Sequence, residues 1–214
     1  MIMNVANLDY NGYNGNIYYE IAKCECENNR NRGCWMNNIV YKELKIEDIN
    51  TKLFSKFNRY QDVKKCWRKI DGEWILKDIA FVENWSEREY EFLVKCLIDT
   101  INMGGSVYAA FKDNYLVGFA SLENEKFGAE NKYLQLSSIH TSYKSRGLGI
   151  GKKLFSIMIE EAKKRGAKKL YISAHSSEES RAFYEKLGCV EAEEYNKKLV
   201  KLEPCDCQLE YKIV

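Results

Sequence analysis

The chain has 214 residues, of which 45% are apolar and 13% aromatic. This length fits one domain, or one domain with an appendage, and the apolar fraction excludes wholesale disorder. The 33 basic residues nearly balance the 31 acidic ones, so the charge indicates no nucleic-acid partner, and no apolar stretch is long enough to span a membrane.

Residues 1–37 form an Asn-rich segment that we expect to be an extension before the main domain. Two Asn-Gly pairs, at 11–12 and 14–15, predict turns, and apolar residues alternate with polar ones at 17–21, which predicts one added strand. The segment lacks the basic and apolar regions of a secretory signal, so a cytoplasmic location is expected.

The eight cysteines include two C-x-C pairs, at 24 and 26 and at 205 and 207. One interpretation is a zinc-dependent structural protein built on these pairs. Structural zinc sites favour a wider spacing, often with histidines nearby, whereas His140 and His175 lie far from both pairs in the sequence. In a cytoplasmic protein we therefore expect reduced thiols and no bound metal.

From residue 38 to residue 214, apolar residues recur at strand and helix spacings, which predicts a single domain of the α+β (mixed α/β) class. The Asp71-Gly72 pair between two apolar-rich runs predicts a tight hairpin. The predicted elements are, in chain order, a strand at 39–44, an amphipathic helix at 47–57, a hairpin on either side of 71–72, a helix that begins after Ser86 and ends at Gly104, a hairpin over 107–122, a strand at 133–141, a helix from Ile150 to Gly166, a strand at 170–174, a helix that ends at Gly188 and a final strand at 207–213.

Two of these helices begin with a capping box, in which a serine is followed three residues later by a glutamate. The boxes are Ser86 with Glu89 and Ser176 with Glu179. The helix that starts at Ile150 has its apolar residues on one stripe, so this helix should pack against the sheet.

The segment SRGLGIGK, from Ser145 to Lys152, joins a predicted strand to a predicted helix and is glycine-rich. Free N–H groups and the helix dipole favour an anion at a helix N-terminus, and glycines let the anion approach the backbone closely. The segment therefore predicts a phosphate or pyrophosphate site. Its spacing fits neither a Walker A loop nor a dinucleotide fingerprint, which would need glycine at position 152.

This run resembles the phosphate-binding motif of the GNAT family of N-acetyltransferases, Q/R-x-x-G-x-G/A, here Arg146-x-x-Gly149-x-Gly151. The resemblance extends to the preceding strand LQLSSIHTS and to the following KKLYISAHSSEESRAFYEKLGC, with its F-Y-x-x-x-G ending. It covers roughly residues 38–214 and is strongest over 132–190. It implies a central mixed, mostly antiparallel sheet flanked by helices, with the fourth and fifth strands splayed apart.

The resemblance also implies acetyl-CoA as the acyl donor and a primary amine, on a small molecule or a peptide, as the acceptor. In the family the loop amides bind the pyrophosphate, the fourth strand contacts the pantetheine arm, and an asparagine near the start of the last helix often contacts the cofactor. The matching positions here are Arg146, Gly147, Leu148, Gly149, Ile150 and Gly151 for the loop, Ile139, His140 and Thr141 for the strand, and Ser177 in place of the asparagine.

For catalysis, the resemblance implies that Tyr184 protonates the departing thiolate and that a backbone N–H near 139–141 stabilises the oxyanion. Gln135 aligns with a glutamate that some members use as a base. The base could instead be His140, Glu123, Glu83 or ordered water, and His140 is neutral enough near pH 7 to serve. Because Gln135 replaces a carboxylate, a binding or sensing module with little turnover is the alternative function.

Three tryptophans, Trp67, Trp74 and Trp85, should cluster near the first helices. They could form an aromatic wall for a cationic amine or pack the predicted hairpin onto the core. The sequence does not choose between these roles, nor between a monomer and a homodimer.

Overall fold

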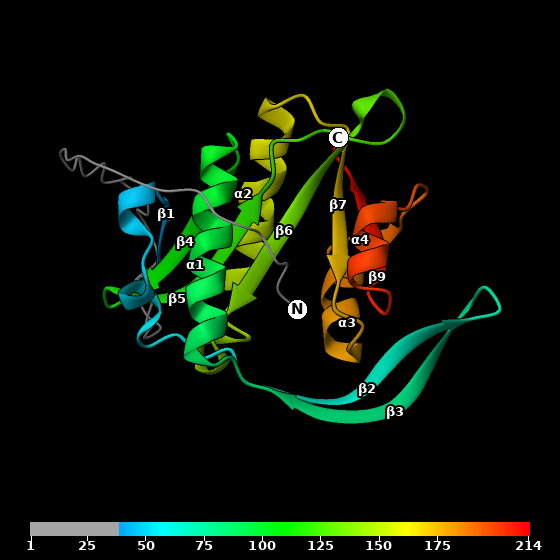
Figure 1. Cartoon of the computed structure of the whole chain (residues 1–214), viewed down its shortest axis with the longest axis horizontal. Coiled ribbons are helices and arrows are strands. Elements are labelled where there is room, and N and C mark those ends of the chain that lie inside the picture. Colours follow the sequence, from blue (N-terminus) through cyan, green and yellow to red (C-terminus); the bar gives the residue numbers. More distant parts are fainter. Residues whose placement is uncertain (1–38) are drawn as a thin grey trace, which may run out of the picture. The chain divides into compact units, whose positions relative to one another are not determined.

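A computed structural model of the protein describes residues 39–214. The expected extension at 1–37, its strand at 17–21, the domain boundary at residue 38 and the first C-x-C pair lie outside the described residues. Figure 1 shows how the described elements are arranged.

Seven strands form the central sheet in the order β1-β4-β5-β6-β7-β9-β8. All neighbours are antiparallel except β6 and β7, which are parallel. This confirms the predicted mixed, mostly antiparallel sheet. The strands are β1 (Ile39–Glu43), β4 (Ser106–Lys112), β5 (Tyr115–Leu122), β6 (Tyr133–Thr141), β7 (Lys169–Ala174), β8 (Val190–Glu191) and β9 (Cys207–Lys212).

Helices cover both faces of the sheet because adjacent strand residues point to opposite faces. On β6, Leu134 joins the core beneath α2 (Ile150–Lys164) and α3 (Glu178–Lys186), whereas its neighbour Tyr133 joins the core beneath α4 (Lys197–Leu202). The helix α1 (Glu87–Asn102) packs on β4 and β5 on the same face as α4 (Figure 1).

The hairpin of β2 (Gln61–Ile70) and β3 (Glu73–Glu83) forms a separate two-stranded sheet, with its turn at Asp71-Gly72 as predicted. Its strand β2 lies beside the start of α3, where the Trp67 N–H donates to the carbonyl oxygen of Ser176 at 2.7 Å. The Arg181 guanidinium stacks over Trp67, with 4.3 Å between the guanidinium carbon and the ring centre. The hairpin is therefore fixed to α3, the first helix after β7.

Three local expectations differ from the structure. The predicted helix at 47–57 is two short 3₁₀ helices, Ile46–Asp48 and Thr51–Phe54, because the Asn50 side chain accepts the Leu53 N–H and caps a new turn. The cap of α3 is Ser177, whose hydroxyl accepts the Ser180 N–H, and not Ser176. The short elements β8 and α4 carry too few residues for a clear periodicity and were not predicted. The capping box of α1 and the other long elements are confirmed.

The described cysteines, at 66, 96, 189, 205 and 207, are all free thiols. Within residues 39–214 no three His, Cys, Asp or Glu side chains gather as a metal site. None of the helices in this part of the chain has the length and apolar character needed to cross a membrane.

The packing of α2 against the sheet supplies a test of the fold. Leu154 is fully buried on α2, whereas Leu202 at the end of α4 is 43% exposed. Leu154→Ala should lower the free energy of unfolding by about 2–5 kcal/mol, because it leaves a cavity in the core. Leu202→Ala, the matched control, should cost much less. Urea unfolding of both variants measures the difference, and equal losses would contradict this packing.

Candidate functional site

The strands β6 and β7 pair only over three positions, which end at Gln135 opposite Tyr171, and they diverge beyond. A β-bulge in β6 accounts for this divergence. Leu136 lies opposite Leu122 but Ser138 lies opposite Ser121, so Ser137 is an extra residue that bends the strand. The expected splay is confirmed, and beyond Gln135 the edge of β6 that faces β7 is left without a strand partner in the described chain.

The glycine-rich loop connects the open end of β6 to α2. Gly147 and Gly149 have φ angles of +80° and +77°, and a Cβ atom built at either residue would meet no other atom within 4 Å. Hydrogen bonding inside α2 begins with the Lys153 N–H, which donates to the Gly149 carbonyl at 3.0 Å. The amides of Ile150, Gly151 and Lys152 therefore have no acceptor within the helix, and they stand at its positive end beside open space. This arrangement can bind an anion.

Two residues fix the loop against its neighbours. A Cβ atom on Gly151 would lie 3.1 Å from the Phe183 ring of α3, so only glycine fits without displacing the ring. Arg146 donates from Nη2 to the Tyr60 carbonyl at 2.7 Å and from Nε to the Thr141 carbonyl at 3.4 Å. Burial lowers the pKa of Arg146. Its guanidinium thus holds the loop in place, and a direct contact of Arg146 with a ligand stays a prediction.

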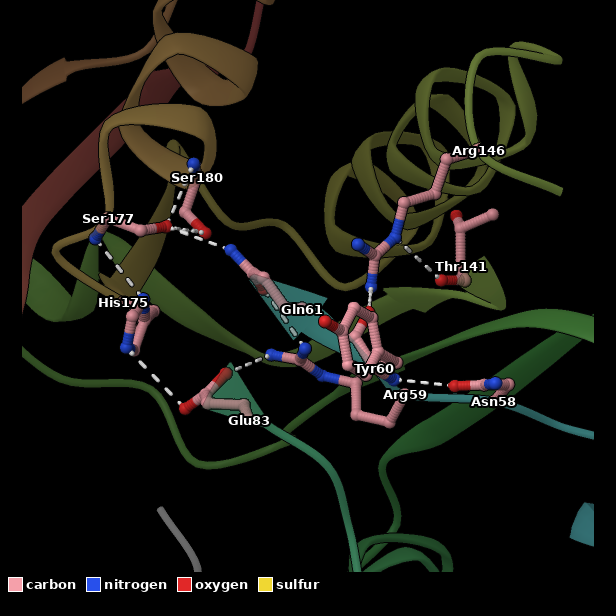
Figure 2. A network of polar contacts seen from close by, with 10 residues as sticks. All are labelled: Asn58, Arg59, Tyr60, Gln61, Glu83, Thr141, Arg146, His175, Ser177 and Ser180. Carbon is pink, nitrogen blue, oxygen red and sulfur yellow. Dashed lines mark hydrogen bonds and ion pairs between the residues drawn. The ribbon is translucent and has the colours of Figure 1, made fainter. Parts of the chain in front are cut away.

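A polar network connects the hairpin to α3 (Figure 2). The side chain of Arg59, only 9% exposed, donates to Glu83 Oε2 and to Gln61 Oε1, each at 3.0 Å. Gln61 Nε2 in turn donates to the Ser177 hydroxyl at 3.1 Å. The Nε atom of Arg59 is buried without a hydrogen-bond partner in the described structure. Sequence reasoning missed Arg59 and Gln61, because no local pattern marks a contact between residues so far apart in the chain.

His175 follows β7 and completes this network. Its Nδ1 accepts the Ser177 N–H at 3.2 Å, so the neutral ring carries its proton on Nε2, which lies 3.5 Å from Glu83 Oε1. Burial lowers the pKa of His175, although the nearby Glu83 opposes this effect. The ring is therefore neutral at pH 7, with its Nε2–H near Glu83. Ser177 is fully buried and its hydroxyl is used by Gln61 and Ser180, so its contact with a cofactor stays a prediction.

On β6, Ile139 lies opposite Ala120 of β5, and Thr141 lies opposite Gly118. The edge of β6 that faces away from β5 therefore faces the slot between β6 and β7. The ring of His140 packs against Trp85 and Phe119, with centroids 4.9 and 5.2 Å apart. Burial, together with the charge of Arg59, lowers the pKa of His140 well below its ordinary value, so the ring is neutral at pH 7.

The three tryptophans do not form one cluster. Trp67 and Trp74 lie on the hairpin and pack against the core beneath α2 and α3, with Arg181 over both rings. Trp85 lies instead beside α1, in contact with Tyr90 and His140. Trp67 and Trp74 therefore pack the hairpin onto the core, and of the three tryptophans only Trp85 lies beside β6.

Tyr184 faces the core more fully than the sequence suggested. It is 8% exposed and packs against Phe155 and Phe183, while Phe183 and Leu187 are half-buried. Helix α3 is therefore oriented so that Tyr184 lies on the side of the helix that packs against the sheet, and not at the edge of that side. Burial raises the pKa of Tyr184 above its ordinary value, so the phenol is protonated. Its hydroxyl forms no hydrogen bond with any described residue.

The expected alternative bases are placed as follows. Glu83 is paired with Arg59, and Glu123 Oε1 accepts hydrogen bonds from the hydroxyls of Thr100, at 2.9 Å, and Ser137. Gln135 lies in the paired segment of β6, before the strands separate.

Comparison with known proteins places these features in a family. The model of the acetyltransferase (GNAT) family matches residues 66–189, which is more than half of the chain. No curated protein sequence matches significantly.

Several solved structures share the fold. Nourseothricin acetyltransferase superposes with a TM-score of 0.61 at 14% identity, over 82% of this chain and 99% of that one. A putative streptothricin acetyltransferase from Bacillus anthracis str. Ames, in complex with acetyl coenzyme A, has a TM-score of 0.60 at 19% identity, over 81% and 95%. The PaiA N-acetyltransferase from Thermoplasma acidophilum, in complex with coenzyme A, has a TM-score of 0.52 at 19% identity, over 82% and 99%.

The Arg59–Glu83 pair supplies a test of the network. Arg59→Met should lower the free energy of unfolding by about 1–3 kcal/mol, because Glu83 keeps a charge that has lost its partner while water still reaches it. Adding Glu83→Gln should recover part of this loss. Denaturant unfolding of both single variants and the double variant measures the coupling. Lys65→Met, which breaks an exposed pair with Asp78, is the control and should change little. Strict additivity of the two changes would contradict the pairing.

Proposed function

The chain belongs to the GNAT family of acetyltransferases, and on that premise we propose that it transfers the acetyl group of acetyl-CoA to a primary amine by direct attack on the thioester. The observation that carries this proposal is the loop at the start of α2. It combines two glycines at positive φ, open space above them and three helix amides without intrahelical acceptors, beside a slot between diverging strands. A pyrophosphate needs such donors, and a pantetheine arm needs such a slot.

In this proposal the amides of residues 147–151 bind the pyrophosphate, and the exposed Lys152 and Lys153 add positive charge. The unpaired edge of β6 near Ile139, His140 and Thr141 offers backbone hydrogen bonds to the pantetheine arm. A backbone N–H on this edge also stabilises the oxyanion that develops when the amine attacks.

Tyr184 is proposed to donate its proton to the departing thiolate. Its burial keeps the hydroxyl protonated, and its lack of a protein partner leaves the hydroxyl free to donate. The same burial that weakens the phenol as an acid also makes a desolvated thiolate a stronger base, which keeps the transfer feasible.

The acceptor is proposed to be a primary amine of a small molecule or a peptide, and the reaction is proposed to take place in the cytoplasm, where the free thiols of this chain would stay reduced. A screen of primary amines, with release of the CoA thiol as the readout, tests this function. Tight binding of acetyl-CoA without turnover on any amine would favour the binding or sensing module instead.

Gly149→Glu tests the loop. The new carboxylate would stand where the pyrophosphate is proposed to bind, so acetyl-CoA affinity should fall by about 100-fold or more. Gly72→Glu is a matched control, because Gly72 also has a positive φ and open surroundings but lies in the hairpin turn. Titration calorimetry on both folded variants makes the comparison, and unchanged affinity in Gly149→Glu would overturn the loop assignment.

Tyr184→Phe tests the proton donor, since it removes only the hydroxyl. With a good acceptor, kcat should fall by about 100- to 10,000-fold, the usual range for one proton-transfer group. The dissociation constant of acetyl-CoA should change far less. Tyr115→Phe, at an exposed tyrosine, is the control and should keep full kcat. Near-normal kcat in Tyr184→Phe, with chemistry rate-limiting, would leave water as the donor.

A further inference from the structure

Acetyl transfer to an amine also requires a group that removes the ammonium proton, and the groups expected from the sequence are poorly suited to that task. Glu83 is paired with the buried Arg59. The Oε1 atom of Glu123 already accepts two hydrogen bonds, one of them from Thr100. His140 is enclosed by aromatic rings, and a base whose pKa is far below that of the ammonium accepts its proton weakly.

The carboxylate of Asp206, which is not among these groups, lies at the end of a chain of hydrogen bonds. All bonds of the chain run in the same direction from donor to acceptor. The Asn196 N–H donates to the Tyr171 hydroxyl at 2.9 Å, and Tyr171 donates to Gln208 Oε1 at 2.6 Å. Gln208 Nε2 donates to the Ser173 hydroxyl at 3.0 Å, and Ser173 donates to Asp206 Oδ2 at 3.3 Å. Each hydroxyl in the chain accepts one bond and donates the next, so the Oδ2 atom of Asp206 accepts the last of these bonds.

The position of Ser173 places this carboxylate beside the part of β7 from which β6 has diverged. The last paired residues of β6 and β7 are Gln135 and Tyr171. Ser173 is two residues farther along β7, on the same face as Tyr171, where β6 has already diverged. Asp206, the residue before β9, is half-buried and hydrogen-bonded to the Ser173 side chain, so its carboxylate lies over the end of β7, on the face covered by α4 and next to the part of the slot where β6 has diverged.

The surroundings of Asp206 suit a base. Burial, and after it a hydrogen bond with the carboxyl group of Glu203 at the end of α4, raise the pKa of Asp206 to about 8. The charge of Asp206 also acts on Tyr184 and Cys207. A carboxylate with this pKa binds a proton much more strongly than an ordinary one. The two carboxyl groups also attract a cationic amine.

Given the proposed acetyl transfer, on which this inference rests, we infer that Asp206 takes the proton from the ammonium group of the acceptor. The N–H bond breaks, and the freed lone pair forms the C–N bond to the thioester carbon. The C–S bond then breaks as Tyr184 gives its proton to sulfur, and a second proton lost from nitrogen restores the phenol. Asp206 releases its proton to water, so the products are an amide, the CoA thiol and one proton.

The test compares Asp206→Asn with the unmodified protein on three small primary amines, ethylamine, glycinamide and trifluoroethylamine, whose ammonium groups are increasingly acidic in that order. Asparagine resembles the protonated carboxyl that burial favours, so the variant should fold. For ethylamine, which is protonated near pH 7, kcat/KM should fall by about 100-fold or more. For trifluoroethylamine, which is already neutral, the loss should be less than about tenfold, because no proton has to be removed first.

The pH profile gives a second readout. A carboxylate base is inactive when protonated, so kcat/KM for ethylamine should rise with pH through the pKa of Asp206, about 8, and Asp206→Asn should lack this rise. Asp78→Asn, at an exposed aspartate of the hairpin, is the control and should behave as the unmodified protein.

The outcomes separate the two proposals. If the unmodified protein acetylates none of the amines, the proposed function fails and this inference fails with it. If it acetylates them but Asp206→Asn loses the same factor on all three, Asp206 has only a structural role and this inference alone is overturned. It is also overturned if His140→Gln, and not Asp206→Asn, removes the pH limb and the dependence on amine acidity.

Discussion

The extra residue at Ser137 is the constraint on which the site depends, because it turns two parallel neighbours into the walls of a slot. After Gln135 the facing edges of β6 and β7 no longer satisfy each other's N–H and C=O groups. Backbone groups that lose ladder partners need other partners, so an extended ligand with its own amides can complete the sheet there. The loop and α2 then follow directly from the end of the diverging strand.

Other contacts hold the two walls in place from outside the sheet. Arg59 connects the end of β3, through Glu83, to the start of α3, through Gln61 and Ser177. Arg146 connects the loop to the segment before β2. The hairpin and the segment before it are therefore held both to α3 and to the loop. The two ends of the site offer different groups. The loop offers helix amides, whereas carboxyl groups lie on the face covered by α1 and α4.

Much of the fold was predictable from local pattern. The Asp71-Gly72 turn, the capping box of α1 and the strand at 133–141 each involve residues that are neighbours in the chain, and the structure confirms all three. The two wrong predictions, of a helix at 47–57 and of the cap of α3, also have local causes. Asn50 offered a cap inside an expected helix, and two adjacent serines at 176 and 177 could each have capped α3. In the structure the Ser176 hydroxyl accepts a hydrogen bond from Arg68, and Ser177 caps the helix.

By itself the sequence determined the kinds of element, their order and the glycine-rich loop, because backbone conformation at glycines, turns and helix caps depends on a few consecutive residues. The tertiary structure alone decided which polar side chains meet one another around the site. Glu83 lies 24 residues from Arg59, Gln61 lies 116 from Ser177, and Asp206 lies 33 from Ser173. Such pairs leave no periodic trace in the chain, since their contact depends on how the hairpin, β7 and β9 come together and on the burial that results.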